Sequence, residues 1–142
     1  MSSGKALAAL VGLVGAVSIH DHLTTSKHDR VVRKTAKSIE REAPEATLHV
    51  DHESGVGNGQ PDTIERYRPD ITVRDFPRFL AIEIETRDSL DTHASEQLEA
   101  FASKRNYTAV LVVPSSTVPV AEEFVENRVD ADVRVATPSN VV

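Results

Sequence analysis

The chain has 142 residues, 22 acidic and 16 basic side chains, a formal net charge of −6 and no cysteine. This length is typical of a single domain that can bury a core of its own. The lack of cysteine excludes disulfides, thiolate zinc sites and a cysteine nucleophile. The acidic balance excludes a protein that coats nucleic acid through bulk charge, so contact with DNA would need a local basic patch.

The composition also bears on the cellular environment. Arginine outnumbers lysine by eleven to five. An acidic, lysine-poor chain without cysteine fits a halophilic protein in a salt-rich cytoplasm, where high ionic strength screens self-repulsion. An ordinary acidic protein from a GC-rich genome would have a similar composition, and both interpretations stay open.

Residues 6–19 carry no charge and are preceded only by Lys5. The run is too short for a membrane span, which needs about 20 residues. It resembles the core of a signal peptide, with Ala16-Val17-Ser18 as a cleavage site, and its glycines would allow close contact between helices. Three interpretations of residues 1–25 stay open: a packed helix or one that forms a homodimer, an export signal or membrane anchor, or a frayed tail.

An amphipathic helix is expected next. It begins at Ser26, whose hydroxyl suits an N-cap, and it ends at Ala43-Pro44. Apolar residues recur between these ends at helical spacing, and residues 47–50 follow as a short strand. Residues 54–62 are rich in glycine but lack the lysine and the spacing of a phosphate-binding loop, so we expect a flexible connection there.

The second half of the chain alternates strands and helices. Residues 71–73 and 79–86 have the pattern of two strands joined by the turn Asp75-Phe76-Pro77. A helix is predicted over residues 92–104. The apolar run at 109–113 suits a strand that is buried on both faces.

A final helix and strand complete the expected order. Pro119 suits the first turn of a helix that ends near Asn127, and residues 133–136 are expected to form an edge strand. The elements then follow one another as α-β-β-β-α-β with a terminal α-β addition. This order predicts one α/β domain over residues 26–142, with the apolar segment 1–25 before it.

The most informative residues are two glutamates in the strand predicted at 79–86. Successive side chains of a strand point to opposite faces, so Glu83 and Glu85 share a face and their apolar neighbours share the other. Two adjacent carboxylates repel each other and are costly to bury. A divalent cation such as magnesium would remove this cost. Asp70, at the start of the neighbouring strand, can supply a third carboxylate to a metal that activates water and stabilises charge on a phosphate.

These residues resemble the motif of the PD-(D/E)XK nuclease superfamily. Pro69-Asp70 stands at the Pro-Asp position, and Glu83-Ile84-Glu85 stands where the family has an acid, any residue and a lysine. The resemblance covers residues 26–113. It implies a restriction-endonuclease-like α-β-β-β-α-β core, with a mixed central sheet flanked by helices and an extra C-terminal helix and strand.

The resemblance also implies a chemistry. Asp70, Glu83 and Glu85 would bind Mg²⁺ or Mn²⁺, and the protein would hydrolyse phosphodiester bonds of DNA. Glutamate replaces the motif lysine at position 85, as it does in a few restriction enzymes of the superfamily that use Glu-x-Glu. Lys37 or Lys104, on neighbouring helices, could in principle stand in for the missing cation.

Three further residues are candidates for the site. Many members of the superfamily carry a glutamine on the helix after the acidic strand, and Gln97 falls there. His28 and Glu40 lie on or near the apolar face of the first helix, which often contributes a site residue in these folds. A helix-start cap for His28 and a solvated surface charge for Glu40 are equally acceptable interpretations.

Several alternatives stay open from the sequence. Pro61-Asp62 is a second Pro-Asp pair, but it lies in the glycine-rich loop, which favours Asp70. The triplet at residues 20–22, His-Asp-His, could suggest a separate metal site, although a fourth ligand is missing. Glu83 and Glu85 could also lie on an edge strand that exposes them to solvent.

Two functions follow from these observations. The first is a magnesium-dependent DNA nuclease in the cytoplasm. The second is a catalytically inactive module of the same fold, with a structural or nucleic-acid-associated role. Export, or membrane contact through residues 6–19, is the alternative to a cytoplasmic location.

Overall fold

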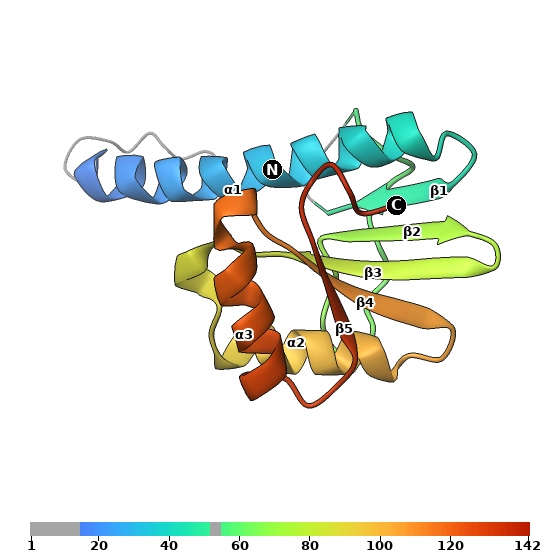
Figure 1. Ribbon diagram of the computed structural model, residues 1–142. Helices are drawn as coiled ribbons and strands as arrows, with labels where there is room; N and C mark the ends of the chain where they lie inside the picture. Colours follow the sequence, from blue (N-terminus) through green and yellow to red (C-terminus); the bar gives the residue numbers. More distant parts are fainter. Residues whose placement is uncertain (1–14, 52–54) are drawn as a thin grey trace.

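The computed structural model describes residues 15–51 and 55–142, with side chains from Lys27 onward. In this part of the chain five strands form one sheet, and three α-helices pack around it (Figure 1). The strands, whose spatial order equals their chain order, are β1 (Thr47–Val50), β2 (Ile71–Asp75), β3 (Arg78–Ile84), β4 (Tyr107–Val112) and β5 (Val133–Ala136). The helices are α1 (Gly15–Glu42), α2 (Thr92–Ser103) and α3 (Val118–Arg128).

The sheet is mixed. β1, β2 and β3 pair in antiparallel fashion, whereas β3, β4 and β5 pair in parallel fashion. The parallel neighbours are joined through α2 and α3, because a parallel pair cannot be closed by a tight hairpin. The expected order of elements is confirmed, including the terminal helix and strand, and β5 is an edge strand as predicted.

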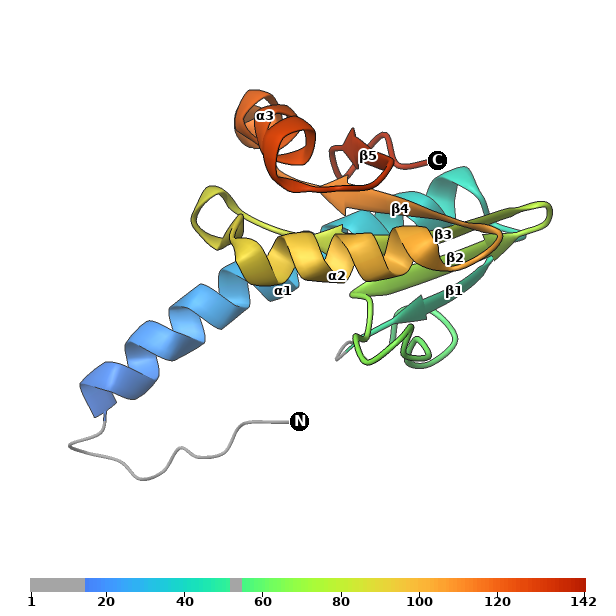
Figure 2. The same cartoon turned by 90° about the horizontal axis from the view of Figure 1, so that it is seen from below.

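Helices cover the sheet on both sides (Figure 2). α1 buries Val32, Ala36 and Ile39 in one apolar cluster with alternate side chains of the sheet. α2 and α3 bury Leu98 and Phe124, together with other apolar side chains, against the opposite face. Polar groups that lie between these layers are withdrawn from water, which sets the electrostatics of the site.

The first helix differs from the sequence prediction. α1 is continuous from Gly15 to Glu42, so Ser26 lies inside the helix and does not cap it. No proline or glycine interrupts residues 16–42, and the polar residues before Ser26 do not break a helix that packing supports further along. The helix therefore crosses the boundary expected at residue 25. The apolar run lies partly outside the described residues, and no helix in the described part is long and apolar enough to cross a membrane.

The glycine-rich loop is not the flexible connection that we expected. Its described part runs along the outer edge of β1, where Asn58 N donates to Leu48 O at 2.6 Å and Val50 N donates to Gly59 O at 2.8 Å. Gly57 has a φ of +75°, and a Cβ there would lie 2.8 Å from Leu48 O. The loop pairs with backbone groups that an edge strand would otherwise leave open, and glycine is required because the two backbones approach so closely.

Candidate functional site

Three carboxylates meet where β2 begins and β3 ends. Ile71 pairs with Ile82, and the backbone N–H of Asp70 donates to Ile82 O at 3.0 Å, so Asp70 lies opposite Glu83. Side-chain alternation then turns Glu83 and Glu85 away from the face that packs on α1, whereas Asp70 contacts His28 of α1. The strand predicted to residue 86 ends at Ile84, although the Glu85 N–H still donates to Val112 O at 3.0 Å.

The two glutamates are buried. Glu83 is 6 % exposed and Glu85 is 7 % exposed, because β3 is a central strand flanked by β2 and β4. The alternative in which an edge strand shows both glutamates to solvent is therefore wrong. The apolar neighbours Ile82 and Ile84 are fully buried on the opposite face, as the alternation predicts.

Asp70 is held by two donors from different elements. Its Oδ2 accepts a hydrogen bond from the backbone N–H of Ile84 at 2.8 Å and lies 3.4 Å from His28 Nε2. His28 Nδ1 lies 3.4 Å from Asp29 Oδ1, so the imidazole ring stands between two carboxylates. The hydrogen bond to Asp70 outweighs the effect of burial and raises the pKa of His28 to about 9. At neutral pH His28 is therefore an imidazolium that balances part of the negative charge.

Glu83 and Glu85 lie in a different environment. Burial raises the pKa of Glu83 well above its usual range, and the charges of Asp70 and Glu85 raise it further. Burial also raises the pKa of Glu85, although the Ser89 hydroxyl opposes this shift. A hydrogen bond between the two carboxyl groups raises the pKa of Glu83 and lowers that of Glu85, which indicates that Glu83 holds the proton. One oxygen of Glu83, Oε1, is buried without a hydrogen-bond partner in the described part of the chain.

The donor set suits a hard divalent cation, because all three carboxylates offer oxygen ligands. The unpartnered Oε1 of Glu83 is an acceptor that a cation would satisfy. In the described residues, however, no three His, Cys, Asp or Glu side chains are already grouped closely enough to hold a metal ion. Side-chain rearrangement and loss of the Glu83 proton would have to accompany metal binding.

The other candidate residues lie around the cluster or away from it. Gln97 is half-buried on α2, and no hydrogen bond joins it to these carboxylates within the described part of the chain. Glu40 is exposed and accepts from the Gly57 N–H at 3.2 Å, which is a structural role. Lys37 is exposed on α1. Lys104 lies 5.9 Å from the ring centroid of Tyr107, which pairs with the opposite end of β3. His28 is therefore the cation that reaches Asp70.

Two contributors were not predicted from the sequence. Ser89, in a short 3-10 turn after β3, acts on Glu85, and its hydroxyl also accepts from the Thr86 N–H at 2.9 Å. Asp29 is the second partner of His28. A Thr-x-x-Ser spacing after an acidic strand, and an acid next to a helix histidine, were the only available signals. The triplet at residues 20–22 falls within α1, where its side chains lie outside the described set.

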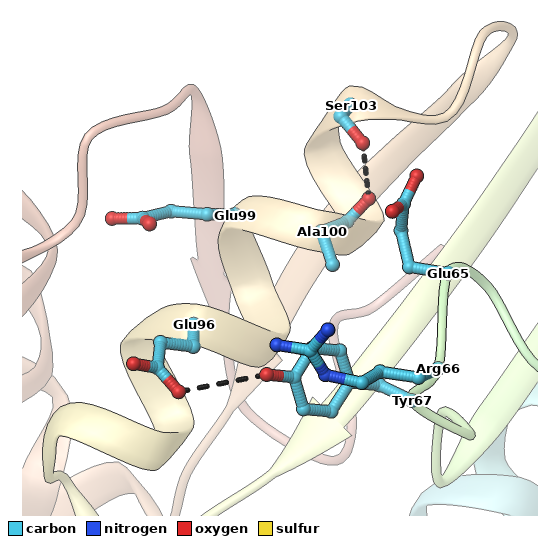
Figure 3. Close-up of a pocket in the computed structure, with 7 residues that line it drawn as sticks. All are labelled: Glu65, Arg66, Tyr67, Glu96, Glu99, Ala100 and Ser103. Carbon is cyan, nitrogen blue, oxygen red and sulfur yellow. Dashed lines mark hydrogen bonds between the residues drawn. The ribbon is translucent and has the colours of Figure 1, made fainter.

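A shallow surface depression of about 410 Å³ lies apart from the carboxylates (Figure 3). It is formed by residues 65–67 and the outer side of α2, and Tyr67 Oη lies 3.5 Å from Glu96 Oε1 across it. Neither Asp70 nor the glutamates of β3 line it. The concave surface and the unusual charges are thus separate features of the molecule.

Comparison with protein-family models, with curated proteins and with solved structures gives no match.

Proposed function

We propose that the chain is a divalent-metal-dependent nuclease of the restriction-endonuclease-like fold, which hydrolyses phosphodiester bonds of DNA. The observation that carries the proposal is the meeting of Asp70, Glu83 and Glu85 at the ends of β2 and β3, with both glutamates buried. Burying carboxylates costs free energy, and clusters with strongly raised pKa values are typical of functional sites.

The arrangement of elements supports the finer fold assignment. The order α-β-β-β-α-β leads through an antiparallel hairpin into a parallel pair, so the strands that carry Asp70 and the glutamates are direct neighbours. The residues of the motif resemblance lie at the ends of these strands: Pro69-Asp70 directly precedes β2, and Glu83-Ile84-Glu85 spans the end of β3. Fold and motif therefore support the same family assignment by separate routes.

A bound Mg²⁺ or Mn²⁺ would polarise a phosphate oxygen and lower the pKa of a water molecule. Asp70, Glu83 and Glu85 are the residues that would hold it. The backbone N–H of Ile84 orients the Asp70 carboxylate. Ser89 orients the Glu85 carboxylate.

His28 supplies the positive charge that the family places at position 85. Its Nε2 lies 3.4 Å from Asp70 Oδ2, and its side chain is 40 % exposed, so a phosphate could approach it from solvent. An imidazolium at this position would attract the negative charge of a phosphate, while its two N–H groups face Asp29 and Asp70. Glu85 is then free to act as a metal ligand or as a general base.

The second candidate function is an inactive module of the same fold. The glutamate at position 85 and the net charge of −6 favour it, because both work against the approach of an anionic substrate. Asp70 and the glutamates would then have a structural role, and the proton on Glu83, in place of a cation, would reduce the repulsion between the carboxylates.

Cleavage of supercoiled plasmid DNA separates the two functions. The wild-type protein should nick it with Mg²⁺ or Mn²⁺ but not with EDTA, and Glu83→Gln should remove the activity. Glu123→Gln, which changes an exposed glutamate of α3 in the same way, should retain it. Mn²⁺ binding followed by electron paramagnetic resonance adds a readout independent of catalysis. Binding without cleavage would favour the inactive module, and absence of Mn²⁺ binding would reject the metal site.

A further inference from the structure

The outer surface of α1 carries a row of positive charge. Five basic residues follow one another at spacings of three, four, three and four, which places them on one side of a helix. Each of them is exposed, and none forms an ion pair with another described residue. We call this row the basic stripe; it consists of Lys27, Arg30, Lys34, Lys37 and Arg41.

The basic stripe lies opposite the buried side of the helix. At about 100° per residue its members fall within a sector of about 80°. The side chains that pack on the sheet, Val32, Ala36 and Ile39, point the other way. The acidic residues of this stretch of helix lie outside the sector. One of them, Glu40, accepts a hydrogen bond from the Gly57 N–H. The stripe therefore presents cations without interspersed acids.

Such a row is unexpected in this chain. Acidic residues outnumber basic ones by 22 to 16. An ordinary solvated helix face in an acidic protein would mix both signs, because i,i+4 pairs of opposite charge stabilise the helix. Like charges three and four residues apart instead destabilise it slightly. A local positive field is thus maintained against both the net charge and the stability of the helix.

We propose that the basic stripe is the surface on which the phosphate backbone of duplex DNA docks. From Lys27 to Arg41 the helix rises about 21 Å, a length over which the axis of B-DNA carries about six phosphates on each strand. Lys27 directly precedes His28, whose ring contacts Asp70, and the stripe runs from Lys27 along α1 to Arg41. The proposal rests on the proposed function, since it names the surface that holds the DNA substrate.

Two other occupants fit the stripe less well. A helix that lies on an anionic membrane inserts an apolar face between the lipids while its cations contact the headgroups. Here the apolar face of α1 is already buried against the sheet, and Figure 2 shows α1 packed behind the strands. A second copy of the chain could offer the acidic outer side of α3, but a duplex offers a regular row of charge as long as the stripe.

The test uses the full chain and a fluorescein-labelled 20-base-pair duplex, with EDTA present so that no cleavage occurs. The stripe variant is Lys34→Gln with Lys37→Gln. The control variant is Arg66→Gln with Arg105→Gln, which removes two exposed cations elsewhere. Glutamine preserves helix propensity and length of side chain. Anisotropy gives Kd between 50 and 200 mM KCl.

The wild type should bind with a steep salt dependence. The stripe variant should bind at least tenfold more weakly at 100 mM KCl, and the slope of log K against log salt should fall by about 2, because each lost phosphate contact removes about 0.9. The control variant should keep the wild-type slope. Equal losses in both variants, or no loss in the stripe variant, would overturn the proposal.

Four further results have definite meanings. Stripe-dependent binding of phosphatidylserine vesicles without binding of the duplex would assign the surface to membranes and overturn the proposal. A stripe-dependent change in sedimentation of the protein alone would assign it to self-association and do the same. If the duplex binds in a stripe-dependent way but the protein cuts no plasmid, the proposed nuclease function is rejected and the docking surface is supported. If the stripe variant cuts plasmid as well as the wild type and has the same Kd, the docking surface is rejected and the nuclease function is supported.

Discussion

Glu83→Gln should make the protein more stable at neutral pH in the absence of metal. Glutamine has the shape of glutamic acid but does not titrate. In the wild type the folded pKa of Glu83 is raised above its ordinary value of 4.5 by burial, by Asp70 and by Glu85. A carboxyl with a raised folded pKa favours the folded state at low pH. This stabilisation of the folded state is lost as the pH rises from 4.5 toward the folded pKa of the carboxyl.

The size of this effect follows from linkage. For each pH unit over which folded Glu83 keeps its proton while the unfolded chain has lost it, the wild type loses about 1.4 kcal/mol of unfolding free energy. The variant should therefore match the wild type near pH 4.5, and its advantage in unfolding free energy should grow as the pH rises toward the folded pKa of Glu83. The burial of Glu83, only 6 % exposed, means that solvent screens little of this effect.

Urea denaturation at four pH values between 4.5 and 7.5, in EDTA and fixed KCl, measures the difference. Glu123→Gln, on the exposed side of α3, controls for removal of a negative charge from an acidic protein. A Glu83→Gln protein that is less stable than the wild type at pH 7, or a difference that does not change with pH, would refute the reasoning. With free Mn²⁺ at 100 times its Kd in place of EDTA, the wild type should be stabilised by about 2.7 kcal/mol and the variant should be unchanged.

Three other predictions concern separate parts of the molecule. Because the folded pKa of His28 is raised to about 9, the histidine stabilises the folded state below pH 6.5, and this stabilisation is lost as the pH rises through 9. His28→Gln should therefore lower the unfolding free energy measured in urea by at most about 1 kcal/mol at pH 6, and should not change it at pH 10. Gly57→Ala should lower the unfolding free energy by about 1–3 kcal/mol, because its Cβ would meet Leu48 O. Gly55→Ala, with φ +80° and no neighbour within 4 Å, should lower it less, and equal losses would contradict the argument from close approach. The melting temperature of the wild type should rise between 0.1 and 2 M KCl, and an unchanged midpoint would reject the halophilic interpretation.

Local patterns in the sequence predicted much of the sheet. The strand at Thr47–Val50 has the predicted bounds, and Glu83 and Glu85 share a face because alternation is a property of the strand itself. The run at 109–113 was expected to be buried on both faces, and it forms most of β4 in the middle of the parallel pairs. These features depend on neighbours in sequence, which a single chain reveals.

Features that depend on distant contacts could not be predicted. The glycine-rich loop is ordered by two hydrogen bonds with β1, in which Asn58 N donates to Leu48 O and Gly59 O accepts from Val50 N. No local sequence pattern predicts this pairing. The helix that the sequence started at Ser26 continues N-terminally to Gly15, because a cap-like residue does not end a helix when packing supports it. The contact between His28 and Asp70 joins residues 42 positions apart, and it needs the whole fold to form.

If the proposed family assignment is right, glutamate stands at position 85 in place of the motif lysine, and His28 offsets the change in charge. Three ionised carboxylates and one imidazolium leave two negative charges, which one divalent cation would neutralise. Without metal, a proton on Glu83 lowers the same imbalance, at the cost of leaving Oε1 buried and unsatisfied. A lysine at position 85 would give an excess of positive charge once metal and imidazolium were both present. The pair of buried glutamates and the half-buried histidine of α1 are therefore mutually consistent, because the imidazolium offsets part of the negative charge.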